Sequence, residues 1–390
     1  MYCLLLRSSI PCRVIAAGGD GTVNWILSSV MAVKWTSDRT PAVAIIPLGT
    51  GNDTARTFGW GAAFDGARMV QRVVDACSDM STPTTAFNRW EAVLTFGAPL
   101  TVNQASKLPP FVHPFVQAAS AGPAAARPDS AGRFSQDTGA TAASLSSTPE
   151  LKQALLPVAD DRLLNDGAAA SAIVLDNVRG SNNAGAAGAA APRSQYAFQF
   201  NNYFSYGLDS QILQEYHDCR EAHRWCFCHR CVNLACVGFF GAVATCCCLA
   251  KEPDLEIDIR SSPDADWQRL PLPEGLVGLV LLNNKTYAGG RSLWGPDDVQ
   301  PGDVALVGHA QDVGDGLLEL VGLSSSVHLG CISLHCSHGL RLAQAAEVRI
   351  SCRNAMHLQS DGEPWPSSPL ECIVRKAPSA VMLVNRRRAS

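Results

Sequence analysis

The sequence predicts an α/β domain with a doubly wound, mostly parallel sheet, joined to a second, mostly β domain with a sandwich-like fold. Two short apolar segments, residues 13–17 and 42–46, each run directly into a glycine-rich loop, and apolar residues at helical spacing lie between them. This order of strand, loop, helix and strand is a βαβ unit, which is typical of parallel sheets. Beyond residue 195, short apolar segments alternate with turn signals, which indicates strands.

Length and composition favour a globular protein of two domains. The chain has 390 residues, of which 47% are apolar and 17% are charged. Its formal net charge of −4 provides no basic face for nucleic acid. The first residues contain only a short apolar run, so we expect no secretory signal, a cytoplasmic location and reduced thiols for the 15 cysteines.

The domain boundaries follow changes in composition. Residues 98–193 are rich in Ala, Ser, Gly and Pro, so we expect a long disordered insertion there. Arginines at 386–388 favour a solvated basic tail over a contact with anionic lipid headgroups. We therefore expect an α/β domain at 1–85, a β-rich domain at 86–97 and 194–375, the insertion at 98–193 and the tail at 376–390.

Individual elements follow from periodicity. Apolar residues from Val23 onward predict a helix, and residues 340–346 suggest a second, short helix. The uncharged segment 232–250 approaches the length of a membrane span but is weakly hydrophobic, which favours a buried segment of the β-rich domain. Further strands are expected at 277–282, 304–307, 317–321, 348–351 and 356–359.

The two glycine loops predict a phosphate site. Glycines let the backbone approach a phosphate closely, and the helix that follows the first loop contributes its positive N-terminal end. Each loop also contains an aspartate, Asp20 in the first and Asp53 in the second. A carboxylate beside a phosphate requires an intervening cation, so the pair predicts Mg²⁺. The alternative is that the glycines only form turns.

A second group of metal-ligand residue types lies at Cys226, Cys228, His229, Cys231 and 246–248. The spacing is too tight for the usual tetrahedral zinc site, and paired C-x-x-C motifs are absent from the sequence. Buried thiols are therefore the preferred interpretation.

The two loops carry a family resemblance. GGDGTVNW (18–25) and PLGTGND (47–53) resemble the ATP-binding loops of the diacylglycerol kinase family, and the second loop separates this family from NAD kinases and phosphofructokinases. The second half contains a series of motifs that resemble those of the accessory domain of the eukaryotic members, and they occur in the same order along the chain. They are NNYFSYGLDSQI (201–212), NNKTYAGGRSLWG (283–295), GDGLLELVGL (314–323), HLG (328–330), GLRLAQ (339–344) and DGEPW (361–365).

The resemblance implies ATP and Mg²⁺ as cofactors and assigns roles to particular residues. Asp20 and Asp53 would belong to the magnesium network, with Glu363 as a further member. Asp361 would be the general base for the lipid hydroxyl, although a turn aspartate in Asp-Gly is the alternative. Asp315 is expected in a turn or a second, structural metal site. The ATP-binding residues would be Gly18, Gly19, Asp20, Gly21, Thr22, Gly49, Thr50, Gly51, Asn52 and Asp53.

The implied function is transfer of a phosphoryl group from ATP to diacylglycerol at a membrane surface, with peripheral membrane association. The family's first strand and glycine-rich loop normally precede GGDG, and residues 1–17 do not resemble them, so we expect the first part of the catalytic domain to be missing. Two alternatives remain open. The chain could be a sphingosine or ceramide kinase, or a truncated, non-catalytic homologue that binds nucleotide or lipid.

Overall fold

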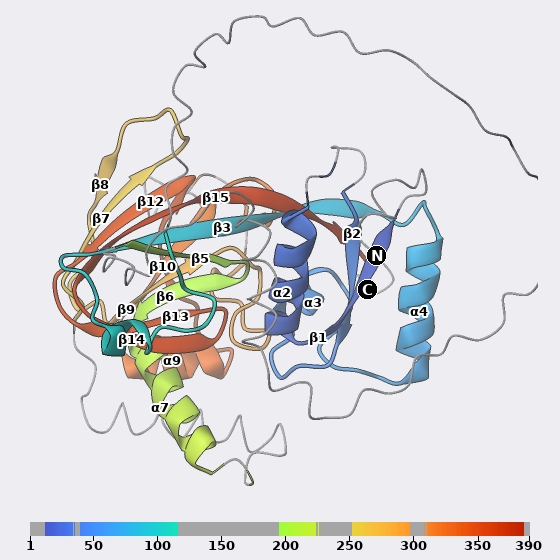
Figure 1. The fold of residues 1–390 in the computed structure, drawn as a ribbon, viewed down its shortest axis with the longest axis horizontal. Coiled ribbons are helices and arrows are strands. Elements are labelled where there is room, and N and C mark those ends of the chain that lie inside the picture. Colours follow the sequence, from blue (N-terminus) through green and yellow to red (C-terminus); the bar gives the residue numbers. More distant parts are fainter. Residues whose placement is uncertain are drawn as a thin grey trace, which may run out of the picture. The chain divides into compact units, whose positions relative to one another are not determined.

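A computed structural model describes residues 12–33, 35, 40–115, 195–223, 225, 252–296, 308 and 310–385. The chain begins with β1 (Arg13–Gly18), α2 (Asp20–Met31) and β2 (Ala42–Pro47). The short helix α3 (Asp53–Thr57) and the amphipathic helix α4 (Ala67–Ser78) follow. In Figure 1, α2 and α4 lie on either side of β1 and β2. The expected βαβ unit is therefore present, and its helix begins at Asp20 rather than Val23.

β1 and β2 form a parallel pair in which Gly18 lies opposite Pro47. Both strands therefore end at the same edge of the sheet, where both glycine loops begin. β2 is buried at every position because it packs against α4 and lies inside the apolar core of this part.

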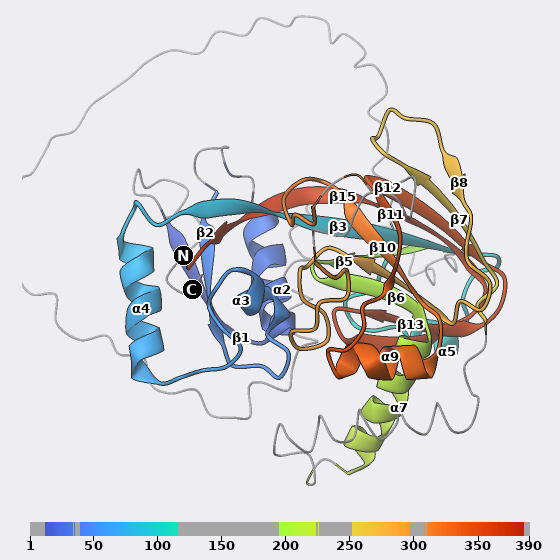
Figure 2. The ribbon, with the colours of Figure 1, turned by 180° about the vertical axis from the view of Figure 1, so that it is seen from behind.

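The expectation of a doubly wound, mostly parallel sheet is wrong. β2 pairs on its other side with the end of β15 (Leu370–Leu383), and β1–β2 and β2–β15 are the parallel pairs of the described sheets. β15 then runs antiparallel to β3 (Thr84–Phe96) along almost its entire length. Figures 1 and 2 show these two strands side by side, running from β2 into the β-rich part. A predominantly antiparallel sheet of nine strands thus includes β1 and β2.

The β-rich part is a sandwich, as predicted. The nine-stranded sheet continues in the order β4-β5-β3-β15-β12-β7-β8, and a six-stranded sheet has the order β11-β10-β9-β6-β13-β14. Side chains from both sheets, including Trp90, Phe198, Phe204 and Trp365, form one apolar core. The remaining strands are β4 (His113–Pro114), β5 (Gln195–Phe200), β6 (Tyr203–Gly207), β7 (Leu255–Arg260), β8 (Gln268–Leu270), β9 (Gly278–Leu282), β10 (Leu318–Leu323), β11 (Leu340–Ala345), β12 (Glu347–Cys352), β13 (Met356–Ser360) and β14 (Glu363–Ser367).

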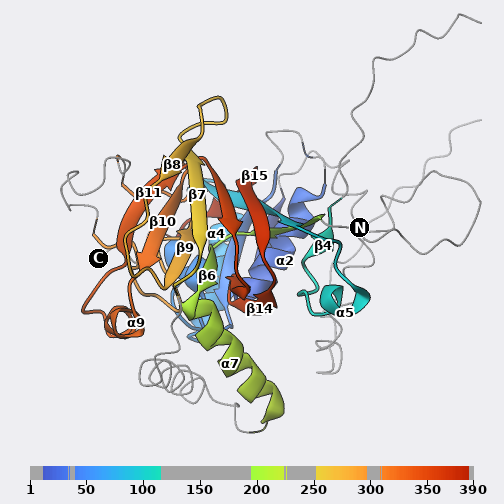
Figure 3. The ribbon, with the colours of Figure 1, turned by 90° about the vertical axis from the view of Figure 1, so that its left-hand side faces the viewer.

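Two helices accompany the six-stranded sheet. α7 (Leu208–Ala222) follows β6, and α9 (Ser326–Ser333) follows β10; Figure 3 shows both below these strands. Leu208 and Ile212 of α7 and Ile332 of α9 join a separate apolar cluster with residues of β9 and β10. This cluster covers the face of the six-stranded sheet that does not contribute to the sandwich core.

Three expectations about segments need correction. Residues 340–345 form β11 rather than a helix, because they pair with β10 across a register shift. The tail does not begin at 376, since β15 continues to Leu383. The expected insertion begins later than 98, because α5 (Val102–Ala105) and β4 are ordered parts of the fold. The expected strand at 304–307, the segment 232–250 and the cysteine group at 226–248 lie outside the described residues.

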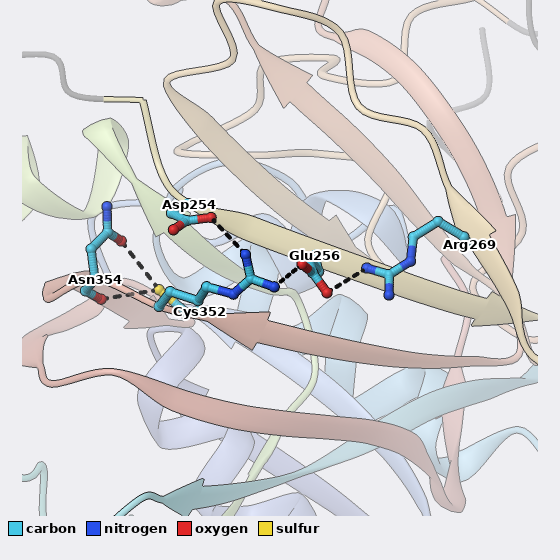
Figure 4. Close-up of polar contacts among 6 residues, drawn as sticks. Asp254, Glu256, Arg269, Cys352 and Asn354 are labelled. Atoms are coloured by element: carbon cyan, nitrogen blue, oxygen red, sulfur yellow. Dashed lines mark hydrogen bonds and ion pairs between the residues drawn. The ribbon is translucent and has the colours of Figure 1, made fainter.

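Ion pairs cover the surface of β7 beside the end of β12. Arg353 forms ion pairs with Asp254 and Glu256, and Arg269 of β8 donates to Glu256 at 3.0 Å (Figure 4). Cys352, at the end of β12, donates through its thiol to the carbonyl oxygen of Asn354. The ion pairs are at the surface and contribute little to stability individually, whereas Cys352 is buried. Within the described segments, no helix combines the length and the apolar character needed to cross a membrane.

Candidate active site

The two glycine loops touch each other through their backbones. A Cβ atom placed on Gly49 would lie 2.4 Å from the Cα of Gly19, and one placed on Gly19 would lie 2.9 Å from the Cα of Gly49. Both glycines have ordinary backbone angles, so the requirement is space rather than conformational freedom. The backbone amide of Leu48 also donates to the carbonyl oxygen of Gly18 at 3.1 Å. The structure therefore brings the predicted loops together as one surface.

The first loop leads into a helix N-terminus that no side chain caps. α2 begins at Asp20, and its N-cap residue Gly19 has no side chain that could accept from the first amides. Gly21 and Thr22 in the first turn are exposed, and so is Thr50 in the second loop. Exposed backbone amides at the positive end of a helix can bind the oxygens of a phosphate.

Asp20 uses its carboxylate to join the two loops. One oxygen accepts from the backbone amide of Asp53 at 3.0 Å, and the other accepts from the amide of Thr54 at 2.9 Å. The hydroxyl of Thr54 lies 2.8 Å from the same second oxygen. Asp20 thus binds the first turn of α3, which fixes Asp53 next to it.

Asp53 has one carboxylate oxygen without a hydrogen-bond partner among the described residues. The other oxygen accepts from the backbone amide of Gly289 at 2.8 Å. The side chain is buried, and this burial, together with the nearby charge of Asp20, raises the pKa of the Asp53 carboxyl. A buried carboxylate with an unused oxygen beside a second carboxylate is the arrangement that a cation would stabilise.

Gly51 provides the space between the two carboxylates. A Cβ atom on Gly51 would lie 3.3 Å from one oxygen of Asp20 and 3.4 Å from one oxygen of Asp53. A side chain here would occupy the place where both acids converge. Mg²⁺ is commonly bound through one or two carboxylates, with water and substrate phosphates completing its shell. The residues therefore fit Mg²⁺, and the described segments contain no group of three or more acidic, His or Cys side chains arranged to hold a metal alone.

Asn52 has a structural role within the second loop. Its backbone is left-handed with φ of 56°, and its side chain is buried. The side-chain oxygen accepts from the Gly49 amide at 2.9 Å, while its nitrogen donates to the carbonyl oxygens of Gly49 and Ala62. Asn52 therefore holds the loop closed from inside and leaves the exposed positions to face a ligand.

The β-rich part also contributes to this site, through a loop that the sequence interpretation did not assign to it. Gly289 donates its amide to Asp53, and the hydroxyl of Thr286 donates to the carbonyl oxygen of Asp53 at 3.2 Å. Gly289 and Gly290 both have positive φ, and a Cβ on Gly290 would lie 2.6 Å from a nitrogen of Arg56. Two adjacent glycines, Gly289 and Gly290, are the available signal in the sequence, but sequence alone does not identify their partner.

Buried asparagines connect the second glycine loop and α3 to the β-rich part. The side chain of Asn283 donates to the carbonyl oxygens of Asn88 and Asn201, and Asn284 donates to the side chain of Asn202 at 2.8 Å. The hydroxyl of Thr54 also lies 2.8 Å from the side-chain oxygen of Asn202. All four asparagines at 201, 202, 283 and 284 are buried. These bonds fix α3, and with it Asp53, relative to β6 and β9.

Asp361 lies in the turn between β13 and β14, with φ of 49°, followed by Gly362 with φ of 91°. Its carboxylate accepts from the backbone amides of residues 201, 202 and 203 at 3.0, 2.8 and 3.1 Å. Burial raises the pKa of Asp361 to about 6, against the lowering effect of these amides, and the charge of Asp20 raises it further. Asp361 therefore has the turn position, and its role as general base stays a prediction.

Around Asp361 lie two side chains that the sequence interpretation did not single out. The side-chain amide nitrogen of Asn24, at the start of the second turn of α2, lies 3.4 Å from one carboxylate oxygen. Arg89 is buried, donates to Asn201, Ser28 and Gln199, and interacts electrostatically with Asp361. Burial lowers the pKa of Arg89 to about 10, which still leaves a cation at neutral pH. Arg89 thus supplies positive charge behind a group of three acids.

The other two predicted acids lie outside this cluster. The Glu363 side chain is 61% exposed, and its carboxylate lies 4.0 Å from a ring nitrogen of His217 on α7. No hydrogen bond joins it to Asp20, Asp53 or Asp361 in the described part of the chain, so the expected place of Glu363 in the metal network is not observed. Asp315 accepts from the backbone amide of Leu317 at 2.8 Å, which is the turn role.

Comparisons with known proteins identify the family of the chain. The diacylglycerol kinase catalytic domain matches residues 5–80, and the diacylglycerol kinase accessory domain matches residues 199–364. Probable diacylglycerol kinase 3 of Caenorhabditis elegans is 25% identical over 97% of this chain and 38% of its own length. Diacylglycerol kinase theta of Homo sapiens is 26% identical over 99% of this chain and 31% of its own length.

The chain therefore spans well under half the length of these two relatives. Diacylglycerol kinase 4 of Arabidopsis thaliana is 25% identical over 90% of this chain and 62% of its own length. Among solved structures, a diacylglycerol kinase from Bacillus anthracis str. Sterne aligns with 99% of this chain and 80% of that chain, at 12% identity and a TM-score of 0.43.

Proposed function

Because the chain belongs to the diacylglycerol kinase family and carries both its catalytic and its accessory domain, we propose that it transfers the γ-phosphoryl group of ATP to the hydroxyl of diacylglycerol. The observation that carries this proposal is the unpartnered, buried oxygen of Asp53 beside the carboxylate of Asp20, at the point where two glycine loops meet. Phosphoryl transfer depends mainly on positioning and charge neutralisation, and this site offers both.

The glycine loops would bind the triphosphate. The exposed amides of Gly21 and Thr22 at the start of α2 are suited to phosphate oxygens, and Gly49 and Gly51 keep the second loop free of side chains that would obstruct them. Asp20 and Asp53 would hold Mg²⁺, which when bound supplies positive charge to the transferring phosphoryl group. Glu363 is left out of this proposal because its carboxylate lies beside α7.

Asp361 is the proposed general base. A pKa of about 6 leaves most of this carboxyl ionised at neutral pH, while keeping it basic enough to accept the proton of the lipid hydroxyl. The backbone amides of residues 201–203 fix its orientation, and the contact with Asn24 is the longest of its hydrogen bonds, at 3.4 Å. The same oxygen accepts from the amide of residue 201 at 3.0 Å, so it would accept the proton in place of the weak contact with Asn24.

The acceptor lipid resides in a membrane, so we propose that the chain binds a membrane surface peripherally. Trp25, in the second turn of α2, and Leu48, at the start of the second loop, are 55% and 56% exposed. Both lie next to the glycine loops, where an exposed apolar side chain could contact acyl chains.

The test is transfer of labelled γ-phosphate from Mg-ATP to diacylglycerol in mixed micelles, with sphingosine and ceramide as alternative acceptors. Asp53→Asn is the preferred inactive variant, because Asp20 also anchors α3 and its loss would disturb the fold. Phosphatidic acid from the parent chain and none from the folded variant is the expected result. Product only from sphingosine or ceramide would assign the chain to that substrate class instead.

Absence of product from every acceptor, with ATP binding retained, would favour the second candidate, a homologue that binds nucleotide without turnover. That candidate is not favoured by the site, since a non-catalytic protein has no need to keep two adjacent carboxylates, one of them buried with an unused oxygen.

A further inference from the structure

The C-terminus of α9 ends in a Schellman motif. His335 has a left-handed backbone with φ of 60°. Its amide donates to the carbonyl oxygen of Ile332 at 3.0 Å, and the next amide, that of Cys336, donates to the carbonyl oxygen of Cys331 at 3.0 Å. The first bond spans three residues and starts at the left-handed residue, and the second spans five residues and starts at the residue after it. Together they define the motif.

In a Schellman motif the side chains of the two residues joined by the longer bond meet each other. Here both of these residues are cysteines. The thiol of Cys336 donates to the carbonyl oxygen of Cys331 at 3.2 Å, and the two thiols are close enough to affect each other's ionisation. Cys336 is exposed and Cys331 is partly exposed, so both can be reached from solvent.

From this geometry we propose that Cys331 and Cys336 form a reversible disulfide that covalently closes the last turn of α9. The backbone bond between the two residues keeps their Cα atoms close, as a disulfide requires. Both thiols are already in contact, so little backbone movement is needed. Two other described cysteines, Cys352 and Cys372, are buried in the sandwich core, where an oxidant in solution has no direct access.

The oxidant is a small disulfide such as oxidised glutathione. The thiolate of Cys336, the more exposed of the two, attacks one sulfur and releases one glutathione thiolate, which leaves a mixed disulfide on Cys336. The thiolate of Cys331 then attacks the Cys336 sulfur and releases the second glutathione. Two protons from the cysteines go to the two released thiolates, so two protein thiols and one small disulfide become one protein disulfide and two small thiols.

The crosslink would act on a segment that braces the active-site loop. His338, two residues after Cys336, contacts the carbonyl oxygen of Ser292 through its ring at 2.9 Å. The amide of Gly339 donates to the carbonyl oxygen of Leu293 at 2.8 Å. Ser292 and Leu293 follow closely after Gly289, whose amide donates to Asp53. A covalent closure of the α9 terminus therefore restrains the residues on which this loop rests.

The experiment exposes the full chain to oxidised glutathione, blocks the remaining thiols by alkylation and maps the peptides by mass spectrometry without reduction. The peptide that carries both cysteines is expected to lose two hydrogen atoms and resist alkylation, and to recover both thiols on treatment with dithiothreitol. Stable glutathione on Cys336 of the parent chain, or alkylation of both thiols after exposure, would overturn the proposal.

Two variants sharpen the result. In Cys331→Ser the second step has no attacking thiol, so Cys336 is expected to retain one glutathione. In Cys77→Ser, which removes a partly exposed cysteine elsewhere, the Cys331–Cys336 crosslink is expected to form as in the parent chain. Hydrogen exchange of the His335 and Cys336 amides should also be slower in the oxidised parent chain than in the reduced one; equal exchange would contradict the closure of the turn.

Discussion

The carboxylate of Asp20 accepts a hydrogen bond from the backbone amide of Asp53, so the acids of the two glycine loops are joined directly. This bond fixes the start of α3, but it does not neutralise either carboxylate. Asp53 remains buried with one unpartnered oxygen, and the charge of Asp20 contributes to its raised pKa. The fold therefore keeps a repulsive pair in place, and a bound cation would relieve this repulsion.

Asp53→Asn is expected to separate stability from activity. A raised carboxyl pKa means that the folded state is favoured when the group is protonated and loses this contribution as pH rises through the folded pKa. At neutral pH, in the absence of Mg²⁺, the neutral amide should therefore raise stability by about 1 kcal/mol. Phosphoryl transfer should fall by about 100-fold or more, the order expected for loss of a preorganised electrostatic group.

Thermal unfolding in chelator and a γ-phosphate transfer assay provide the two readouts. Asp65→Asn is the matched control, because Asp65 is a partly exposed surface acid that pairs with Arg72. The control should keep its turnover. If Asp53→Asn retained Mg²⁺-dependent turnover, the assignment of Asp53 to the metal site would be wrong.

Gly49→Ala tests the contact between the loops. The new Cβ would lie 2.4 Å from the Cα of Gly19, and because that Cα belongs to the backbone and the Cβ is fixed to its own, the loops must move apart. We expect a loss of about 1–3 kcal/mol in the free energy of unfolding, as for overpacking elsewhere. The affinity for ATP should fall as well, since the two loops would no longer form one surface.

Gly21→Ala is the matched control for this substitution. No atom lies within 4 Å of the Cβ position at Gly21, which stands in the first turn of α2. Alanine favours a helix over glycine by up to about 1 kcal/mol, so this variant should be as stable as the parent chain or more stable. Equal destabilisation of both variants in urea unfolding would show that packing between the loops is not the cause.

The βαβ unit and the two acids could be predicted because the signals are local. Apolar runs that end in glycine indicate strands and their loops, and parallel strands bring their carboxyl ends to one edge. The partner of β2 could not be predicted, because Val381 and Met382 of β15 lie more than three hundred residues further along the chain. The mostly antiparallel sheet follows from that pairing and has no local signature.

The segment 340–345 shows a second limit of local reasoning. Its sequence, LRLAQA, consists largely of residues that favour helices. Pairing with β10 and burial of Leu342, Ala343 and Ala345 determine the strand instead. The site shows the same limit: Asp20 and Asp53 were identifiable from their loops, whereas Gly289 reaches Asp53 only through the tertiary fold.

Asp361 is expected to give opposite pH dependences for stability and activity. Its pKa is raised from 3.8 to about 6. The stability that this group contributes is present at low pH and is lost as pH rises between these two values, whereas the base form needed for catalysis increases over the same range. Measured kcat/KM with diacylglycerol should therefore rise with pH, reach half of its maximum at about pH 6 and level off above about pH 7.

Because stability and activity change in opposite directions here, unfolding cannot account for low activity at the acidic end. The measurement is a pH–rate profile paired with urea unfolding at each pH. Asp361→Asn is avoided because its NH2 group would face at least one of the backbone amides of residues 201–203, which donate to both carboxylate oxygens, and would disturb the fold. A rate that stays flat from about pH 5 to pH 7 would remove Asp361 from the role of general base.

Glu319 is a buried acid away from the active site, and it predicts a pH-dependent stability of its own. It lies in β10, where its carboxylate accepts from the side chains of Gln311 and Gln344. Burial raises its pKa from 4.5 to about 8. The folded state therefore holds this proton more tightly than the unfolded state, and stability should fall as pH rises from about 4.5 to 8, by up to about 1.4 kcal/mol per pH unit.

Glu319→Gln should remove this slope, because the amide is neutral at every pH and similar in shape. The variant should gain stability relative to the parent chain as pH rises, and the gain should be measurable by urea unfolding at a series of pH values. Glu256→Gln removes an exposed carboxylate that pairs with Arg269 and Arg353, and should change stability at neutral pH by less than about 1 kcal/mol. Parallel pH curves for the parent chain and Glu319→Gln would mean that Glu319 is already ionised in the folded protein, with its charge stabilised by the two glutamines.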